Sequence, residues 1–145
     1  MIQKPFSPDQ VAGKVRELLT PPARPPRILV AEDDTAVRGF LRTVLEQGGY
    51  EVVEAENGRD AIKEVHAGRV DLLITDLVMP VQEGIETIVA LRKEVLGMGI
   101  IAISGALGGA YLESAAGLGA DAVLKKPVNA DLLLAKVAEV LKSRQ

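Results

Sequence analysis

Carboxylate, hydroxyl and lysine side chains follow four short apolar runs of the chain. The runs and the groups behind them are Ile28–Ala31 with Glu32, Asp33 and Asp34; Leu72–Thr75 with Asp76; Ile100–Ile103 with Ser104; and Ala122–Leu124 with Lys126. If the runs are parallel strands of one sheet, their carboxyl ends meet at a single rim. Converging acids raise one another's pKa unless a cation joins them, and an all-oxygen ligand set suits Mg²⁺. The spacing therefore predicts a Mg²⁺ site beside a lysine and a hydroxyl.

The elements that must position these groups alternate along the chain. Besides the four runs above, Tyr50–Ala55 is a fifth strand candidate, and continuous apolar runs are typical of strands covered on both faces. Segments of helical spacing lie between the runs, and residues 111–118 are a weaker helix prediction because glycines crowd them. Asn57-Gly58 is interpreted as a loop into a helix. This order predicts an α/β protein with a parallel sheet and helices on both faces.

Each group alone also has an ordinary structural explanation. Asp34 or Thr35 could cap the following helix, and Asp76 could be a turn aspartate. Ser104 could belong to a loop and Lys126 could be a solvated lysine. All four groups standing together at strand ends favour the functional interpretation.

Composition excludes several classes of function. The chain has 145 residues, enough for one compact domain, with no cysteine, a net charge of −3 and four aromatic residues. Disulfides and thiolate chemistry are excluded, and a nucleic-acid surface is disfavoured. No apolar run approaches the length of a membrane span or signal peptide, so we expect a cytoplasmic domain without direct membrane contact.

The chain resembles the receiver domains of two-component response regulators and hybrid sensor histidine kinases. The resemblance covers residues 27–143 and is carried by ILVAEDD (28–34), LLITDLVMP (72–80), EG (83–84), IIAISG (100–105) and ADAVLKKP (120–127). It implies a doubly wound, flavodoxin-like sheet of five parallel strands in the order 2-1-3-4-5, with five helices.

The same resemblance implies a role for each residue at the rim. Asp76 would be the phosphoacceptor, Lys126 its paired cation and Ser104 the hydroxyl that follows the phosphoryl group. Asp33 would bind Mg²⁺ directly, together with Asp76 and the backbone carbonyl of Val78, and Glu32 would bind through water. The peptide bond between Lys126 and Pro127 would be cis.

The implied function is a step in a phosphorelay. The donor would be a phosphohistidine on a histidine kinase or a histidine phosphotransfer domain, and phosphorylation would switch interactions with a downstream partner that the sequence does not name. The domain would catalyse its own phosphorylation and dephosphorylation without being an independent enzyme, although its parent protein could be a hybrid kinase. His66, the single histidine, is expected on a helix away from the rim and is not a phosphodonor.

Some positions depart from the usual pattern of receiver domains. Val123 stands where an aromatic usually reports phosphorylation, and Val128 where a phenylalanine often follows the Lys-Pro pair. Val78 and Ala106 offer no polar group to orient an attacking water, so we expect slow dephosphorylation.

Residues 1–26 are expected to form a helix and a linker outside the receiver domain at 27–145. Residues 4–19 align without gaps to 126–141, with seven of 16 positions identical, and four prolines follow within residues 21–26. The segment is interpreted as the tail of a preceding receiver domain, with an N-terminal helix at about Ser7–Leu19.

Two alternatives stay open at this point. A flavin or nucleotide binder would have the same sheet order, but such proteins cradle phosphate after the first strand, where this chain has three carboxylates. The other alternative is an interaction module whose pocket no longer turns over.

Overall fold

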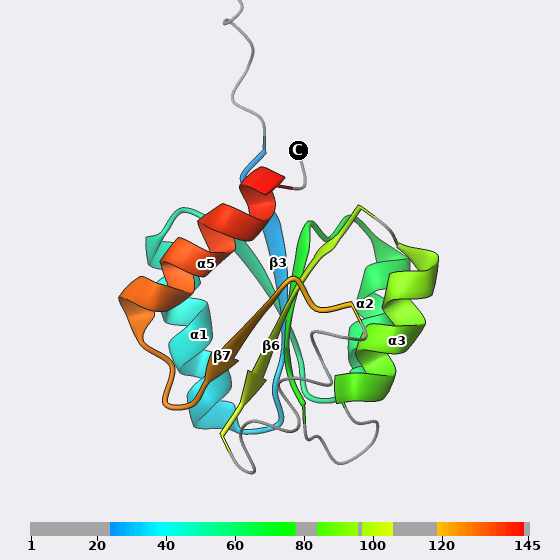
Figure 1. The fold of residues 1–145 in the computed structure, drawn as a ribbon, viewed down its shortest axis with the longest axis horizontal. Helices are drawn as coiled ribbons and strands as arrows, with labels where there is room; N and C mark the ends of the chain where they lie inside the picture. The colour runs from blue at the N-terminus through cyan, green and yellow to red at the C-terminus, as the bar shows by residue number, and fades with distance from the viewer. Residues whose placement is uncertain (1–23, 78–83, 96, 106–118, 144–145) are drawn as a thin grey trace, which may run out of the picture.

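The computed structural model describes residues 24–77, 84–95, 97–105 and 119–143, which form one parallel sheet with helices on both faces. Along the chain the elements are β3 (Arg27–Ala31), α1 (Thr35–Gln47), β4 (Glu51–Ala55), α2 (Gly58–Ala67), β5 (Leu72–Asp76), α3 (Gly84–Glu94), β6 (Gly99–Ser104), β7 (Ala122–Lys125) and α5 (Ala130–Ser143). The five strands are all parallel and stand in the order β4-β3-β5-β6-β7 (Figure 1). The predicted order 2-1-3-4-5 is confirmed.

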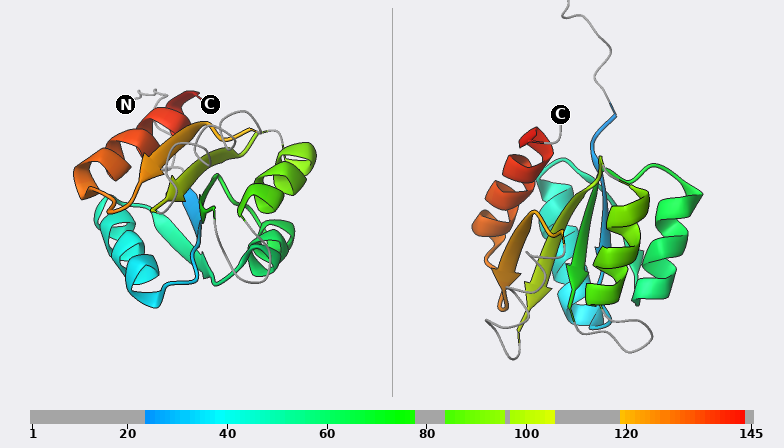
Figure 2. Two further views of the ribbon diagram at one scale, coloured as in Figure 1. Left: turned by 60° about the horizontal axis from the view of Figure 1, so that its bottom comes forward. Right: turned by 45° about the vertical axis from the view of Figure 1, so that its right-hand side comes forward.

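Helices α1 and α5 cover one face of the sheet, and α2 and α3 cover the other (Figures 1 and 2). Successive residues of β3 alternate between the two faces. Ile28 and Val30 belong to the core cluster with α1 and α5, whereas Leu29 and Ala31 belong to the cluster with α2 and α3. A strand that is buried on both sides needs apolar residues at every position, which explains the continuous apolar runs in the sequence.

Three strands end one residue later than predicted, at Asp76, Ser104 and Lys125. Asp76 pairs with Ile103 in the β5–β6 ladder, and Ser104 pairs with Lys125 in the β6–β7 ladder. Strand pairing uses backbone groups, so a polar side chain does not end it. The sheet itself therefore holds Asp76 and Ser104, which the sequence had placed just beyond the strands. At the other end, β4 begins at Glu51 rather than at the predicted Tyr50, because Glu51 is the partner of Arg27.

Four helices lie within the described residues, and the other two expected helices fall outside them. The weaker helix prediction at residues 111–118 and the N-terminal helix at residues 7–19 both stay predictions. In the ranges given above, no helix combines the length and the apolar character needed to cross a bilayer.

Candidate functional site

The acidic loop, residues Glu32, Asp33 and Asp34, connects the carboxyl end of β3 to α1. Asp34 is the N-cap of α1, and its Oδ1 accepts hydrogen bonds from the backbone N–H groups of Ala36 (2.9 Å) and Val37 (3.2 Å). Capping satisfies donors at the start of the helix, so the ordinary explanation is correct for this acid. Glu32 and Asp33 remain as candidates, and they differ sharply in exposure: Glu32 is buried, whereas Asp33 is exposed.

Lys126 joins the acidic loop to β5. Its Nζ lies 2.8 Å from Glu32 Oε1 and 3.3 Å from Asp76 Oδ2. Asp76 is the last residue of β5 and is 7% exposed, so its carboxylate is nearly enclosed at the rim. The expected cis peptide bond between Lys126 and Pro127 is present. One ammonium is therefore shared between two buried carboxylates, one in the loop after β3 and one at the end of β5.

Burial and the neighbouring charged groups both affect the pKa of Glu32. Desolvation raises the pKa of Glu32 to about 7, which outweighs the opposite effect of the Lys126 ammonium and of the Asp34 N–H that Glu32 Oε2 accepts at 3.1 Å. Burial lowers the pKa of Lys126, but its pairing with Glu32 and Asp76 outweighs this and leaves that pKa above its usual value. The site therefore favours an additional positive charge.

The three acids at the rim fit a divalent cation. Glu32, Asp33 and Asp76 each offer a carboxylate oxygen, and these oxygens all lie within 4.8 Å of one another. Glu32 Oε1 is buried and accepts no well-directed hydrogen bond from the described residues, although Lys126 Nζ stands at ion-pair distance. An all-oxygen set with one under-coordinated buried oxygen matches the preference of Mg²⁺ for hard ligands.

Ser104 is the last residue of β6. It is 2% exposed, and its carbonyl accepts a hydrogen bond of 3.0 Å from the backbone N–H of Lys126. The structure thus brings the ends of β6 and β7 together next to Asp76. Val78 and Ala106, which also carried predictions, lie outside the described residues.

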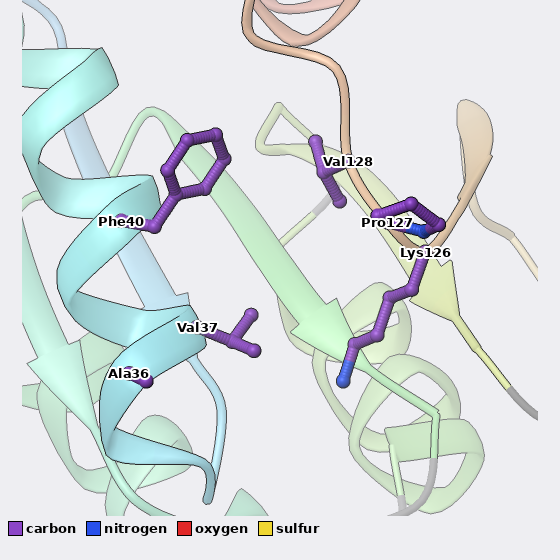
Figure 3. A pocket seen from close by; sticks show the side chains of 6 residues that line it. All are labelled: Ala36, Val37, Phe40, Lys126, Pro127 and Val128. Carbon is purple, nitrogen blue, oxygen red and sulfur yellow. The ribbon is translucent and has the colours of Figure 1, made fainter.

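A mostly apolar groove of about 590 Å³ opens beside the rim, between α1 and the chain that follows β7 (Figure 3). Its lining consists of Ala36, Val37, Phe40, Lys126, Pro127 and Val128. Val37 and Phe40 stand on the α1 side and Pro127 and Val128 on the other. Phe40 is 43% exposed, and with Leu132 it is one of the two large hydrophobic side chains exposed in the described part of the chain.

Sequence reasoning missed this groove and also Arg38. Phe40 was counted only among the few aromatic residues, and its exposure on α1 could not be read from the helical pattern. Arg38 contacts the acidic loop through its side chain, and only the folded packing of α1 against β4 makes that visible.

Comparison with known proteins identifies the family. Residues 28–138 match the response regulator receiver domain. The chain belongs to this family. Receiver domains are the phosphoacceptor modules of two-component systems, which favours the receiver interpretation over a flavin or nucleotide binder.

Individual relatives agree with this assignment. The chain is 37% identical over 120 residues to the response regulator MprA of Mycolicibacterium vanbaalenii, covering 81% of this chain and 51% of that protein. It is 35% identical over 115 residues to the CAI-1 autoinducer sensor kinase/phosphatase CqsS of Vibrio cholerae, covering 77% of this chain and 17% of that protein. The chain thus spans about half or less of these curated relatives.

A solved structure with the same fold is a CheY-like response regulator receiver domain protein from Methanospirillum hungatei. It superposes with a TM-score of 0.79 at 32% identity, covering 83% of this chain and 96% of that one. The receiver domain of this chain therefore corresponds to nearly the whole of the chain in that structure.

Proposed function

We propose that this receiver domain transfers a phosphoryl group from a phosphohistidine to Asp76, in a reaction that depends on Mg²⁺. The observation that carries the proposal is the Lys126 ammonium, which contacts both Asp76 and Glu32 at the carboxyl ends of the strands. Glu32, Asp33 and Asp76 would hold the metal, with Val78, outside the described residues, as the predicted backbone ligand.

The chemistry assigned to these residues is an in-line displacement. A carboxylate oxygen of Asp76 forms the new O–P bond while the P–N bond to the donor histidine breaks, and its electron pair returns to the imidazole. Mg²⁺, when bound, supplies a Lewis acid for the charge on the phosphoryl oxygens. Lys126 neutralises charge at the same centre, and the Ser104 hydroxyl donates to a phosphoryl oxygen of the product.

The domain is proposed to act as a phosphorelay component rather than as an independent enzyme. Its substrate is its own Asp76, so each phosphoryl transfer changes the domain itself. Aspartyl phosphate adds charge and acceptor oxygens at the rim, which provides a means of switching partner contacts.

The groove beside Lys126 is the proposed docking site for the phosphodonor. A protein donor must bring its histidine to Asp76, and the groove shares Lys126 with that site. Its walls are apolar, and Phe40 and Val37 stand on α1 at helical spacing, which suits the apolar face of a partner helix. The proposed occupant is therefore a helix of a histidine kinase or histidine phosphotransfer domain.

Two variants test these assignments separately. Asp76→Asn should abolish labelling by acetyl phosphate with Mg²⁺, measured as intact mass, while circular dichroism shows that the fold is retained. Persistent labelling of this variant would refute Asp76 as the acceptor. Phe40→Ala should slow transfer from a phosphorylated histidine protein but leave labelling by acetyl phosphate unchanged. Equal slowing with both donors would place Phe40 in the chemistry or the fold instead.

A further inference from the structure

The side chain of Arg38 connects three parts of the molecule that meet behind the acidic rim. Its Nη1 donates to the backbone carbonyl of Glu32 at 2.7 Å, and its Nε donates to Glu54 Oε1 at 2.8 Å. Arg38 lies on α1, Glu54 on β4 and Glu32 in the acidic loop. The Arg38 side chain is 11% exposed, so these contacts are shielded from solvent.

The position of Arg38 follows from helix geometry. Side chains of a helix tilt toward its N-terminus, so a residue in the first turns covers the chain that precedes the helix. Arg38 is the fourth residue of α1, and its backbone N–H bonds to the carbonyl of Asp34 at 2.9 Å. A cation near a helix N-terminus is unfavourable for the helix dipole. The cation is nevertheless placed there, where Glu54 compensates its charge and the loop carbonyl accepts its hydrogen bond.

Other hydrogen bonds hold the two ends of the acidic loop, and among the described residues the Glu32 carbonyl accepts from Arg38. The N–H of Glu32 donates to the Ala55 carbonyl at 3.0 Å, and the Asp34 side chain caps α1. The peptide unit between Glu32 and Asp33 is planar, so fixing its carbonyl oxygen also limits the orientation of the Asp33 backbone. The direction in which the Asp33 side chain leaves the loop therefore depends on this contact.

We infer that Arg38 is a positioning residue that holds the Glu32–Asp33 backbone in the orientation required for Mg²⁺ binding, with Glu54 orienting the guanidinium. The inference rests on the proposed function, because it assigns Arg38 to the same metal site. Groups that orient metal ligands from behind typically change metal affinity by about 10- to 100-fold when they are removed.

Arg42 provides a matched control. It lies one helical turn after Arg38, and its Nη1 bonds to the other oxygen of Glu54 at 2.5 Å, but its side chain bonds to Glu54 and Glu46 rather than to the acidic loop. Because Arg42 stays bound to Glu54, removing Arg38 does not leave that carboxylate without a cation. The Arg38→Met variant therefore keeps a charge partner at Glu54 and should fold.

The test measures the Kd for Mg²⁺ by titration calorimetry in the wild-type domain and in Arg38→Met and Arg42→Met. We expect about tenfold weaker binding in Arg38→Met and unchanged binding in Arg42→Met. Amide hydrogen exchange of the metal-free proteins should become faster at Asp34, whose N–H donates to Glu32 Oε2 at 3.1 Å, in the Arg38 variant alone. If Arg38→Met does not fold, Arg38→Lys replaces it, because a single ammonium lacks the fork that spans both acceptors.

The outcomes separate this inference from the proposed function. Equal Kd values for the wild-type domain and the Arg38 variant would overturn the positioning role while leaving the metal site intact. Equal weakening in the Arg38 and Arg42 variants would show a general effect of helix α1 and would also overturn it. If the wild-type domain binds no Mg²⁺, the proposed metal site fails first, and the inference fails with it.

Discussion

At the amino ends of the strands three arginines pair with three acids one to one, whereas at the carboxyl ends three acids lie close together and two of them share one lysine. The pairs at the amino ends are Arg27 with Glu51, Arg69 with Asp71, and Arg92 with Asp121. The acids at the carboxyl ends are Glu32, Asp33 and Asp76, of which two contact Lys126. The positive and negative charges are therefore balanced at the amino ends of the strands, which we call the balanced end. The carboxyl ends carry excess negative charge.

The carboxylates at the balanced end also accept backbone hydrogen bonds. Asp71 Oδ2 accepts from the N–H of Arg27 at 2.7 Å, and Asp121 Oδ2 accepts from the N–H of Ile100 at 2.8 Å. Arg92 adds bonds to the Met98 carbonyl at 2.7 Å and the Gly119 carbonyl at 2.9 Å. These acids fasten the starts of strands together. A charged strand end therefore becomes a candidate site when its charges are left uncompensated, rather than when they are merely numerous.

The largest effect is expected from removing the shared cation. Lys126→Met should lower the rate of phosphorylation by acetyl phosphate about 10²- to 10³-fold, the usual loss when a group that stabilises developing charge is removed. Arg69→Met, at the balanced end, should leave the rate unchanged. Time courses of intact mass measure both. A similar rate loss in the two variants would erase the distinction between the ends.

Removal of one metal ligand should have the next largest effect. Mg²⁺ at a hundred times its Kd stabilises a folded domain by about 2.7 kcal/mol, and Asp33→Ala should remove most of this gain. Asp121→Asn should instead lower the melting temperature with and without Mg²⁺, while the rise caused by Mg²⁺ stays as in the wild type. Thermal unfolding with and without Mg²⁺ gives both values. An undiminished rise in Asp33→Ala would move the metal away from the rim.

The pH dependence of stability is expected to identify Glu32. Desolvation raises its pKa from an ordinary 4.5 to about 7 in the folded domain. Between these pH values the folded state keeps a proton that the unfolded chain has released, so the stabilising contribution is complete below about pH 4.5 and is lost as the pH rises through about 7.

The Glu32→Gln variant is neutral at every pH and serves as the comparison. In metal-free buffer, we expect it to lose less stability than the wild type between pH 4.5 and 8, measured by urea unfolding with a chelator present. If stability changed with pH in parallel for the two proteins, the raised pKa of the Glu32 carboxyl would be contradicted.

The smallest effect is expected from the N-terminal segment. We propose that residues 1–26 derive from the tail of a preceding receiver domain and add little to this fold. The Pro26 carbonyl accepts from the Glu51 N–H at 3.1 Å, which places Pro26 at the balanced end of the sheet. Deleting residues 1–25 should change the free energy of unfolding by no more than about 0.5 kcal/mol, as for surface changes. Loss of cooperative unfolding would assign the segment to the core.

Much of the fold and of the rim could be predicted because the signals are local. Leu72, Leu73 and Ile74 form an apolar run since β5 is buried on both faces, and Asp76 follows at the rim. The opposite exposures of the neighbouring Glu32 and Asp33 could not be predicted. They depend on the tertiary contact between Glu32 and Lys126, which follows the distant strand β7. The contact of Arg38 with Glu54 was likewise hidden, since it joins α1 to a separate strand.

Two acids flank the apolar part of β5, one at each end of the sheet, and both lie on one tryptic peptide. Cleavage after Arg69 and Arg92 releases residues 70–92, which contain Asp71 before the strand and Asp76 at its end. Reduction of an aspartyl phosphate with borohydride converts that residue to homoserine, and fragmentation of the peptide locates it. After labelling the wild-type domain with acetyl phosphate and Mg²⁺, we expect homoserine at position 76 and aspartate at position 71. Homoserine at position 71, or in the peptide that contains Asp33, would contradict it.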